Sequence, residues 1–394
     1  MGRLFIVHIG HYLIQPQSGV YQKYMAIYNS LKPIIDLHLI AFTHPGHCSP
    51  DPRVQVIPSP PNLKWKVIDE WMEKNLLSDD VVWLRYPFAS PSLFQLTQKW
   101  GAQMVLEHNT NEITEALFLQ RNAWKSNSIS FKKILSRSWW IYTWNTWVAN
   151  RTDETRWAKA CLQNVKGGIS VTFELEKKLH SIYSQYSTFV LPNCVPLSSL
   201  VDVKNPVVDE VNLKMIMLIG SYDYWQGIER IIKSVESYKG DSKVIQLDIY
   251  GTLPDNLVKK LQKVSSQSFQ IFLLPAIQSS DLGDTLNRYH LGIGTLSLHR
   301  KKMQEACPLK VRDYWRVGLP CLLGYTDTGI LQNPALADWN LIIANDDSEI
   351  PWEKVVQFSE RQKMFSNAIR RQVYQESITY ESKVKELITF LFKK

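Results

Sequence analysis

Short apolar runs alternate with longer stretches in which apolar residues recur every three or four positions. The first kind of run is typical of buried strands and the second of amphipathic helices, so their alternation predicts repeated βα units and a parallel sheet. In the first half, the predicted strands are Leu4–Ile9, Asp36–Phe42, Val54–Ile57, Val81–Arg85, Met104–His108, Gly167–Thr172 and Phe189–Asn193. The predicted helices are Val20–Leu31, Ser92–Trp100 and Phe173–Tyr186.

A polar, irregular stretch at 197–212 separates this series from a second one. The second series has predicted strands at Lys214–Gly220, Ile245–Gly251, Phe269–Leu274, His290–Leu296 and Pro320–Gly324, with helices between them and a helical end from about residue 351. The pattern predicts an α/β protein of two doubly wound, Rossmann-like domains facing a central cleft. We expect domains at 1–195 and 196–374, with a last helix at about 375–394 returning to the first.

Composition narrows the class of protein. The 394 residues suit two domains, and a net charge of +8 with a pI of about 9.0 favours anionic partners. The five cysteines are scattered without a CxxC, which argues against a disulfide framework and against a zinc site and suits a reducing compartment. The amino-terminal apolar run is too short for a secretory signal, and no stretch is long enough to span a membrane. We expect a cytoplasmic protein, attached at most peripherally to the inner face of the membrane.

Glu305–Pro320, EACPLKVRDYWRVGLP, concentrates polar chemistry behind a predicted strand. A helix starting near Pro308 would place free N–H groups and a positive dipole end where an anion such as a diphosphate could bind. Glu305 would lie in the loop before the helix, and Asp313 about one and a half turns inside it. Gly318 permits the helix to end. Two solvated acids on a surface helix remain the alternative.

This stretch resembles the Glu, seven residues, acid pattern of retaining glycosyltransferases of family four, which have the GT-B fold. Other segments fit in order: PNCV at 192–195 resembles the hinge, VTFELEKKL at 171–179 the last helix of the first domain, MLIGSYDYWQGIERII at 217–232 the opening of the second, and LDIYGTLP at 247–254 its next strand and loop. The pairing of WQG with HRK is similar to one branch of the family. Asp313, where the family often has Glu, is a departure.

The resemblance implies roles for individual residues. Glu305 would lie against the donor sugar and Asp313 would bind the ribose. The remaining donor-binding residues would be Gly19, Gly220, Gly251, Pro308, Leu309 and Lys310.

The loop at 221–227 lacks the two cations that many family members have there, with Ser221 and Gln226 in their places. A leaving diphosphate needs positive charge, so we expect Arg300 and Lys301, together with Lys310, to supply it. A solvated basic turn is the alternative.

LEHNTNE, at 106–112, follows a strand of the first domain. By resemblance, His108 would contact the donor sugar or the reacting centre, with Asn109 and Glu112 on the acceptor side. A core histidine with a satisfied partner is the alternative.

Phe131–Lys166 mixes Trp and Tyr with seven Lys or Arg against two acidic residues. Such a mixture fits the surface of an anionic membrane, although an aromatic-rich core helix would have a similar composition.

The predicted function is transfer of a sugar, with retention of configuration, from a nucleotide-sugar to a hydroxyl acceptor. UDP- or GDP-sugars are the expected donors, and a glycan or lipid-linked saccharide of a cell-surface polysaccharide or glycolipid is the expected acceptor. We expect no cofactor and no essential metal, because no Asp-x-Asp follows a strand. A nucleotide-sugar epimerase and an inactive partner subunit of the same fold remain open, whereas no motif supports the nucleic-acid binding that the charge alone would allow.

Overall fold

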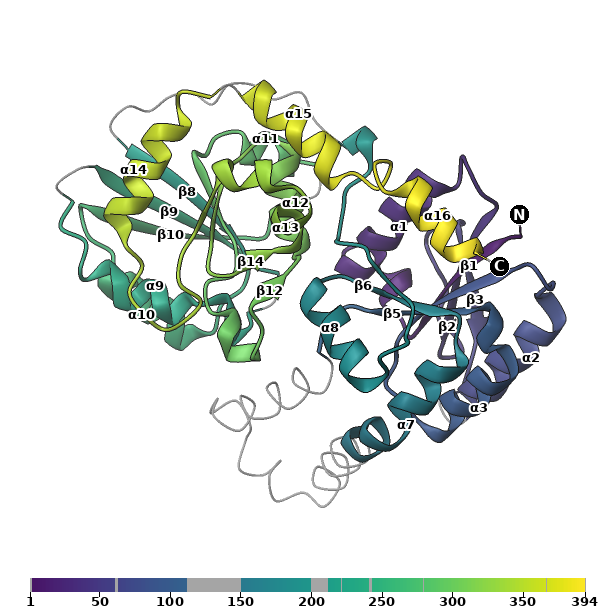
Figure 1. Ribbon diagram of the computed structural model, residues 1–394. Coiled ribbons are helices and arrows are strands. Elements are labelled where there is room, and N and C mark those ends of the chain that lie inside the picture. The colour runs from purple at the N-terminus through teal and green to yellow at the C-terminus, as the bar shows by residue number, and fades with distance from the viewer. Residues whose placement is uncertain are drawn as a thin grey trace, which may run out of the picture. The chain divides into compact units, whose positions relative to one another are not determined.

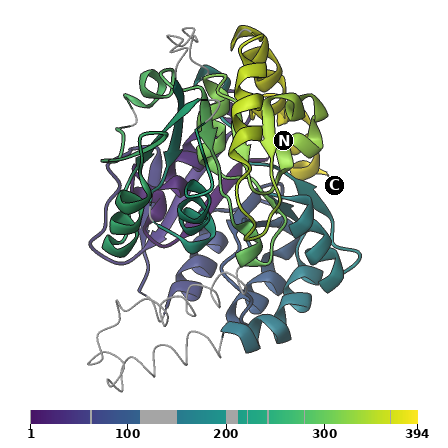
Figure 2. The ribbon, with the colours of Figure 1, turned by 90° about the vertical axis from the view of Figure 1, so that its left-hand side faces the viewer.

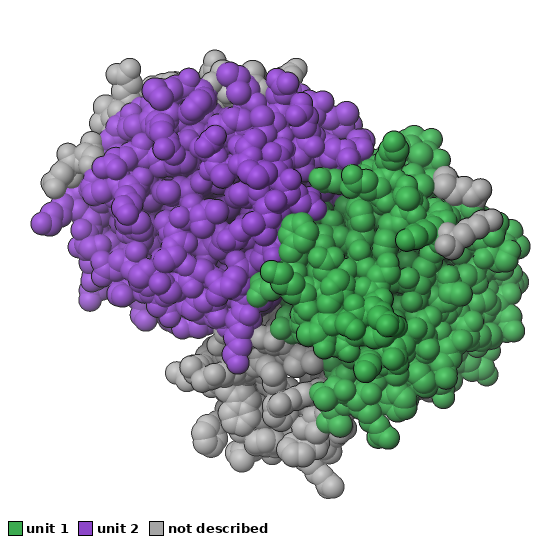
Figure 3. All heavy atoms as spheres, in the orientation of Figure 1, with its two compact units in different colours: residues 1–192, 383–394 green, residues 193–382 purple. Residues whose placement is uncertain are grey.

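The chain forms two compact units, coloured separately in Figure 3. The computed structural model describes residues 2–60, 63–111, 150–199, 212–220, 222–240, 243–278, 280–365 and 367–393. Unit 1 comprises Met1–Pro192 and Lys383–Lys394, and unit 2 comprises Asn193–Ser382. The sequence predicted this boundary at 195 and the start of the returning segment at about 375, whereas the units divide at 192 and 383.

Unit 1 contains a seven-stranded parallel sheet in the order β3-β2-β1-β4-β5-β6-β7 (Figure 1). The strands are β1 (Leu4–Ile9), β2 (Leu37–Thr43), β3 (Val54–Pro58), β4 (Val81–Arg85), β5 (Met104–His108), β6 (Gly167–Ser170) and β7 (Thr188–Val190). The helices are α1 (Gly19–Leu31), α2 (Lys64–Asn75), α3 (Pro91–Trp100), α7 (Asn150–Asn164), α8 (Phe173–Ile182) and α16 (Val384–Phe392). One core cluster joins α2, α3, α7 and α8 to the same face of this sheet.

Local chemistry explains where these helices begin. Ser18, Ser90 and Thr172 cap α1, α3 and α8, each accepting a hydrogen bond from the backbone N–H three residues later. Such caps satisfy N–H groups that a helix leaves without partners. Helix α2, which was not among the predicted helices, buries Ile68 and Met72, and Trp65, Val67 and Trp71 pack partly buried against the same core.

Unit 2 contains a six-stranded parallel sheet in the order β10-β9-β8-β11-β13-β15, with helices on both faces (Figures 1 and 2). The strands are β8 (Asn212–Leu218), β9 (Val244–Tyr250), β10 (Phe269–Leu274), β11 (Leu291–Ile293), β13 (Cys321–Leu323) and β15 (Asn340–Ile342). The helices are α9 (Ile228–Val235), α10 (Asp255–Val264), α11 (Leu282–Leu286), α12 (Leu309–Arg316), α13 (Thr328–Gln332), α14 (Trp352–Gln362) and α15 (Asn367–Ile378). Two parallel, doubly wound sheets confirm the predicted fold class.

A separate two-stranded sheet pairs β12 (Glu305–Ala306) with β14 (Thr326–Asp327). Neither strand was predicted, because two residues are too short to show a period. The pair matters for the site, since it fixes the backbone of Glu305 immediately before α12. Helix α12 ends as expected: Gly318 has φ 73° and donates to the Trp315 carbonyl at 2.9 Å.

Within the described part of the chain, the longest apolar helices fall short of what crossing a bilayer requires. The predicted membrane segment at 131–166 lies largely outside the described residues, which resume with α7 at Asn150.

Candidate active site

Glu305 is held in a fixed position at the start of the predicted donor segment. Its side chain is buried, and its Oε1 accepts a hydrogen bond from the Thr328 hydroxyl at 2.7 Å. The backbone of Glu305 is paired with Thr326 in the two-stranded sheet. Because the carboxylate is oriented by both a strand and a hydroxyl donor, it is preorganised for a defined contact.

A buried ion pair between α12 and β14 stabilises the strand pair that positions Glu305. Arg312 on α12 binds Asp327 in a bidentate fashion, at 2.7 and 3.1 Å, and both side chains are almost fully buried. Asp327 also caps α13 by accepting from the Gly329 N–H at 2.8 Å. Arg312 therefore links α12 to Asp327 of β14, the residue just before Thr328. Because its charge is paired there, Arg312 is a structural residue and not a second anion-binding cation beside Lys310.

Lys310 is a buried cation in the first turn of α12. Pro308 is the N-cap and Leu309 the first helical residue, which matches the predicted helix start. Among the described residues, the Lys310 ammonium has no hydrogen-bond partner. Burial lowers the pKa of Lys310 to about 8, partly offset by the charges of Cys321 and Asp223. An unpartnered buried ammonium beside free helix N–H groups is well suited to receive an anion.

Asp313 lies one turn further along α12. About a quarter of its side chain is exposed, and Arg316 approaches it at 3.5 Å. Burial raises the pKa of Asp313 to about 6, while the charge of Arg316 opposes that shift. The carboxylate is therefore ionised at neutral pH and can accept hydrogen bonds from hydroxyl groups.

Cations from other segments meet the loop between β8 and α9, which lacks Lys and Arg of its own. This loop contains the 3₁₀ helix η5 (Tyr224–Gln226), and a second one, η6 (Leu298–Lys301), packs against it. The Arg300 guanidinium lies 3.8 Å from the Tyr224 ring centroid, and the Lys301 ammonium lies 4.5 Å from that of Trp225. The WQG and HRK segments, paired by resemblance in the sequence, are thus neighbours in space.

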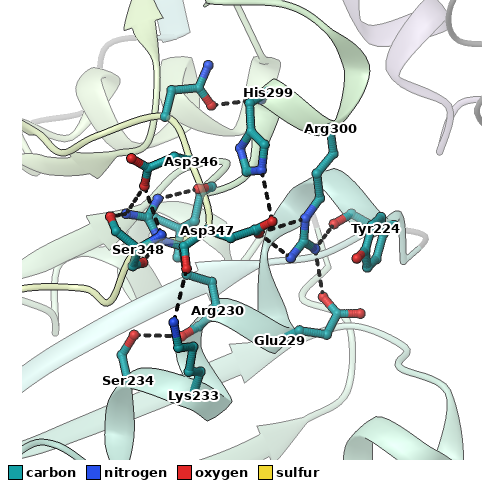
Figure 4. A network of polar contacts seen from close by, with 12 residues as sticks. Tyr224, Glu229, Arg230, Lys233, Ser234, His299, Arg300, Asp346, Asp347 and Ser348 are labelled. Atoms are coloured by element: carbon teal, nitrogen blue, oxygen red, sulfur yellow. Dashed lines mark hydrogen bonds and ion pairs between the residues drawn. The ribbon is translucent and has the colours of Figure 1, made fainter.

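Arg300 already has strong partners within unit 2 (Figure 4). Its guanidinium donates to Asp347 at 2.7 Å, to Glu229 at 3.2 Å and to the Tyr224 carbonyl at 2.9 Å. The neighbouring Arg230 holds the loop that carries Asp347 through the Ser348 and Ala344 carbonyls, at 2.6 and 2.8 Å. These contacts neutralise Arg300 and fix η6, so they favour a positioning role for this residue.

The predicted donor-binding glycines differ from one another. A Cβ on Gly251 (φ +132°) would lie 1.7 Å from the Ile219 carbonyl oxygen, so packing between β8 and β9 explains this glycine without a ligand. A Cβ on Gly220 would meet no atom within 4 Å, which leaves open space at the end of β8. Gly19 is exposed at the start of α1 in unit 1.

His108 ends β5 as predicted and lies buried in unit 1. Its ring packs 4.5 Å from the Tyr86 ring, and its Nε2 has no hydrogen-bond partner among the described residues. Burial, together with the charge of Lys178, lowers the pKa of His108 to about 3, so the imidazole is neutral. Asn109 accepts from the Lys23 ammonium at 2.6 Å, and Glu112 lies outside the described residues.

The sequence analysis missed a buried charge cluster at the same edge of this sheet. Glu107 is fully buried, forms an ion pair with Lys23 and accepts a hydrogen bond from the Tyr24 hydroxyl. The sequence contained part of the signal. A glutamate inside the buried run MVLEH requires a buried partner, and the helix α1 contains a single lysine, Lys23.

No family model and no curated protein sequence matches this chain. Solved structures do match it over nearly its whole length. A glycosyltransferase from Rickettsia africae is 11% identical with a TM-score of 0.63, covering 100% of this chain and 99% of that one. HepE from Anabaena, solved with UDP, is 9% identical with a TM-score of 0.60 and 99% of both chains covered. WaaG, a glycosyltransferase involved in lipopolysaccharide biosynthesis, is 13% identical with a TM-score of 0.55, covering 99% of this chain and 98% of that one.

The chain has the GT-B fold. Identities this low establish the GT-B architecture alone. In this GT-B chain, Glu305, Lys310 and Asp313 lie in one segment of unit 2, formed by β12 and the helix α12 that follows it.

Proposed function

We propose that this chain is a retaining, hexosyl-type glycosyltransferase of family four that uses a nucleotide-sugar donor. The observation that supports the proposal most strongly is the order of three charged side chains along one segment of unit 2. A fixed, buried carboxylate (Glu305) precedes a helix amino terminus with an unpartnered ammonium (Lys310), and an ionised carboxylate (Asp313) follows one turn later. UDP bound to the similarly folded HepE supports a nucleotide as the ligand.

Each group has a task in this proposal. The ammonium of Lys310 and the first-turn N–H groups of α12 stabilise the diphosphate as it leaves with its negative charge. Asp313 accepts hydrogen bonds from the ribose hydroxyls, and Glu305 accepts from hydroxyls of the sugar. Lys301 adds positive charge from η6, whereas Arg300 keeps η6 in place through Asp347 and Glu229.

The bond changes follow a front-face route. The acceptor hydroxyl oxygen bonds to the anomeric carbon while the bond from that carbon to the diphosphate oxygen breaks. The departing phosphate takes the hydroxyl proton, so no protein nucleophile is needed, and the new bond forms on the face that the leaving group vacates. His108 from unit 1 is the proposed contact to the sugar, and Asn109 and Glu112 are proposed on the acceptor side.

A thermal-shift titration with UDP, GDP and uridine tests the donor site. A nucleoside diphosphate at 100 times its dissociation constant should stabilise the folded chain by about 2.7 kcal/mol, and uridine should do much less because it lacks the diphosphate. Equal shifts for uridine and UDP would contradict the proposed role of Lys310. The same titration with EDTA present should give the same shift, since we expect no essential metal.

Incubation with UDP- and GDP-sugars separates the remaining alternatives. Transfer to an added glycan, with the donor's anomeric configuration found in the product by NMR, supports the proposal. An isomerised nucleotide-sugar formed without acceptor would indicate an epimerase. Binding of UDP without any turnover over a broad acceptor panel would indicate an inactive partner subunit.

The acceptor is proposed to be a glycan or a lipid-linked saccharide of a cell-surface polysaccharide or glycolipid. WaaG, which shares the fold, takes part in lipopolysaccharide biosynthesis. The basic, aromatic segment 131–166 would hold the chain peripherally on the anionic inner face of the membrane. Vesicles with anionic lipid should co-sediment the chain at low salt, and neutral vesicles should not; equal behaviour would contradict this part.

A further inference from the structure

The sheet of unit 1 has its own topological switch point. Strands β1 and β4 are neighbours, and the chain continues from β1 toward β2 on one side and from β4 toward β5 on the other. In doubly wound sheets, ligands bind at the carboxyl ends of two such strands, because the connecting loops diverge there. The side chains that end β1 and β4 are therefore the first place to look for a ligand of unit 1.

Arg85 is the last residue of β4. Its side chain is partly exposed, and it forms no hydrogen bond or ion pair with any described residue. Its charge nevertheless acts on its neighbours. Burial lowers the pKa of His8 to about 4 and the charge of Arg85 lowers it further, while the charges of Lys23 and Arg85 lower the pKa of Glu107 against the effect of its burial. The strand register places these three side chains on one face of the sheet.

Glu107 does not neutralise Arg85 by direct pairing, and the reason is visible. The Glu107 carboxylate is taken by the Lys23 ammonium and the Tyr24 hydroxyl, both from α1. Lys23, Arg85 and Glu107 together leave one positive charge in excess, and that excess is on the partly exposed guanidinium. A guanidinium presents a planar, two-pronged donor that matches a carboxylate or a phosphate.

Two further groups lie at the end of β1, the strand next to β4. His8 is only 3% exposed, and its Nδ1 has no partner among the described residues. Tyr12, in the loop after β1, is 51% exposed and lies edge-on to His8 with ring centroids 6.4 Å apart. An exposed aromatic ring offers an apolar face that a sugar ring can cover while its polar groups bond nearby.

We propose that Arg85, His8 and Tyr12 form an acceptor subsite for a negatively charged saccharide, carrying either a carboxylate or a phosphate. This inference rests on the proposed glycosyltransferase function and specifies its acceptor class. Arg85 binds the anion, the Nδ1 of His8 bonds a hydroxyl group, and the Tyr12 ring packs on the sugar. The one positive charge in excess among Lys23, Arg85 and Glu107 thus favours binding of acidic over neutral acceptors.

Ligand-observed NMR on the full chain tests the subsite with three probes: methyl α-glucoside, methyl α-glucuronide and methyl α-glucoside 6-phosphate. At least one charged probe should bind about 10-fold or more tightly than the neutral one, which is the effect expected of a charge-assisted bidentate contact. The stronger of the two charged probes identifies the anion as carboxylate or phosphate. Equal binding of all three would overturn the proposal.

Two variants and a matched control sharpen the result. Arg85→Gln should reduce the charged probes to the level of the neutral one, whereas Lys66→Gln, which removes an equal charge from an exposed site on α2, should leave the preference intact. Tyr12→Ala should weaken all three probes alike. A preference that survives Arg85→Gln, or binding that Tyr12→Ala leaves unchanged, contradicts the assignment.

The affinity for UDP, measured on the same proteins, separates this inference from the proposed function. UDP binding that is unchanged in Arg85→Gln, with the acidic preference lost, supports both. UDP binding with no preference for acidic probes overturns the acceptor subsite alone, and an acidic preference without UDP binding overturns the proposed function instead.

Discussion

Lys23 in unit 1 and Lys310 in unit 2 both have a buried ammonium group, yet their surroundings differ. Lys23 binds the Glu107 carboxylate and the Asn109 side chain. The Lys310 ammonium has no hydrogen-bond partner among the described residues, and only the charges of Cys321 and Asp223 act on it from a distance. A buried charge without a partner lowers stability, so a fold retains one where a ligand provides the missing partner. The contrast separates a cation that holds the fold together from one that is available for chemistry.

Replacing Lys23 should produce the larger loss of stability. Lys23→Met leaves the Glu107 carboxylate buried without its ion-pair partner, which should lower the free energy of unfolding by about 3–5 kcal/mol. Chemical denaturation measures this change. The double variant Lys23→Met/Glu107→Leu should recover part of the loss. If Lys23→Met alone lowers the free energy of unfolding by less than about 1 kcal/mol, Lys23 does not have the proposed role in holding the fold together.

Replacing Glu305 should impair catalysis and leave the fold intact. Glu305→Gln keeps the shape and the hydrogen bond from Thr328 but removes the charge beside the sugar, so turnover should fall by about 10²–10³-fold. Steady-state kinetics give the rate, and calorimetry with UDP should show nearly unchanged affinity. If the variant keeps most of its turnover, Glu305 does not contact the reacting sugar as proposed.

Replacing Lys310 should have the opposite pattern to Lys23. Lys310→Met removes a charge that has no partner, so the ligand-free chain should be at least as stable as the wild type. The affinity for UDP should fall by about 10- to 100-fold, the value of one or two charge-assisted hydrogen bonds. Lys260→Met, at an exposed position on α10, serves as the control and should alter neither property.

The pH dependence should distinguish Lys310 from an ordinary surface lysine. Its pKa is lowered to about 8 in the folded chain, against an ordinary value of 10.5 for a lysine. Between these values the unfolded chain binds more protons at this site, so this lysine's contribution to stability rises with pH, by at most about 1.4 kcal/mol per unit. The affinity for UDP should instead fall above pH 8, as the ammonium loses its charge. Lys310→Arg, which stays charged, should not show that fall.

Residue patterns predicted the large elements well, because long buried strands and capped amphipathic helices leave periodic signals. The runs Leu4–Ile9, Val81–Arg85, Met104–His108 and Phe269–Leu274 have the predicted bounds. The two-residue strands that fix Glu305 escaped prediction because they have no period. A glutamate inside the buried run MVLEH indicates that a partner exists, but the identity of that partner, Lys23, escaped prediction because contacts between α1 and β5 depend on packing that a single sequence does not encode locally.

In the candidate site too, residues from one local segment could be predicted, whereas contacts between distant segments could not. Order along the chain was sufficient to nominate Glu305, Lys310 and Asp313, because all three belong to one helix or to the short strand just before it. Chain order could not show that Asp347 and Glu229 occupy the Arg300 guanidinium, since these residues come from distant segments. It also could not show that packing alone demands Gly251.

A crystal structure of the chain with UDP would show directly where the diphosphate binds. We expect a diphosphate oxygen within hydrogen-bond distance of the Lys310 Nζ and of a first-turn N–H group of α12, with the ribose hydroxyls at Asp313. A diphosphate bound elsewhere, with the Lys310 ammonium still without a partner, would contradict the proposed role of Lys310.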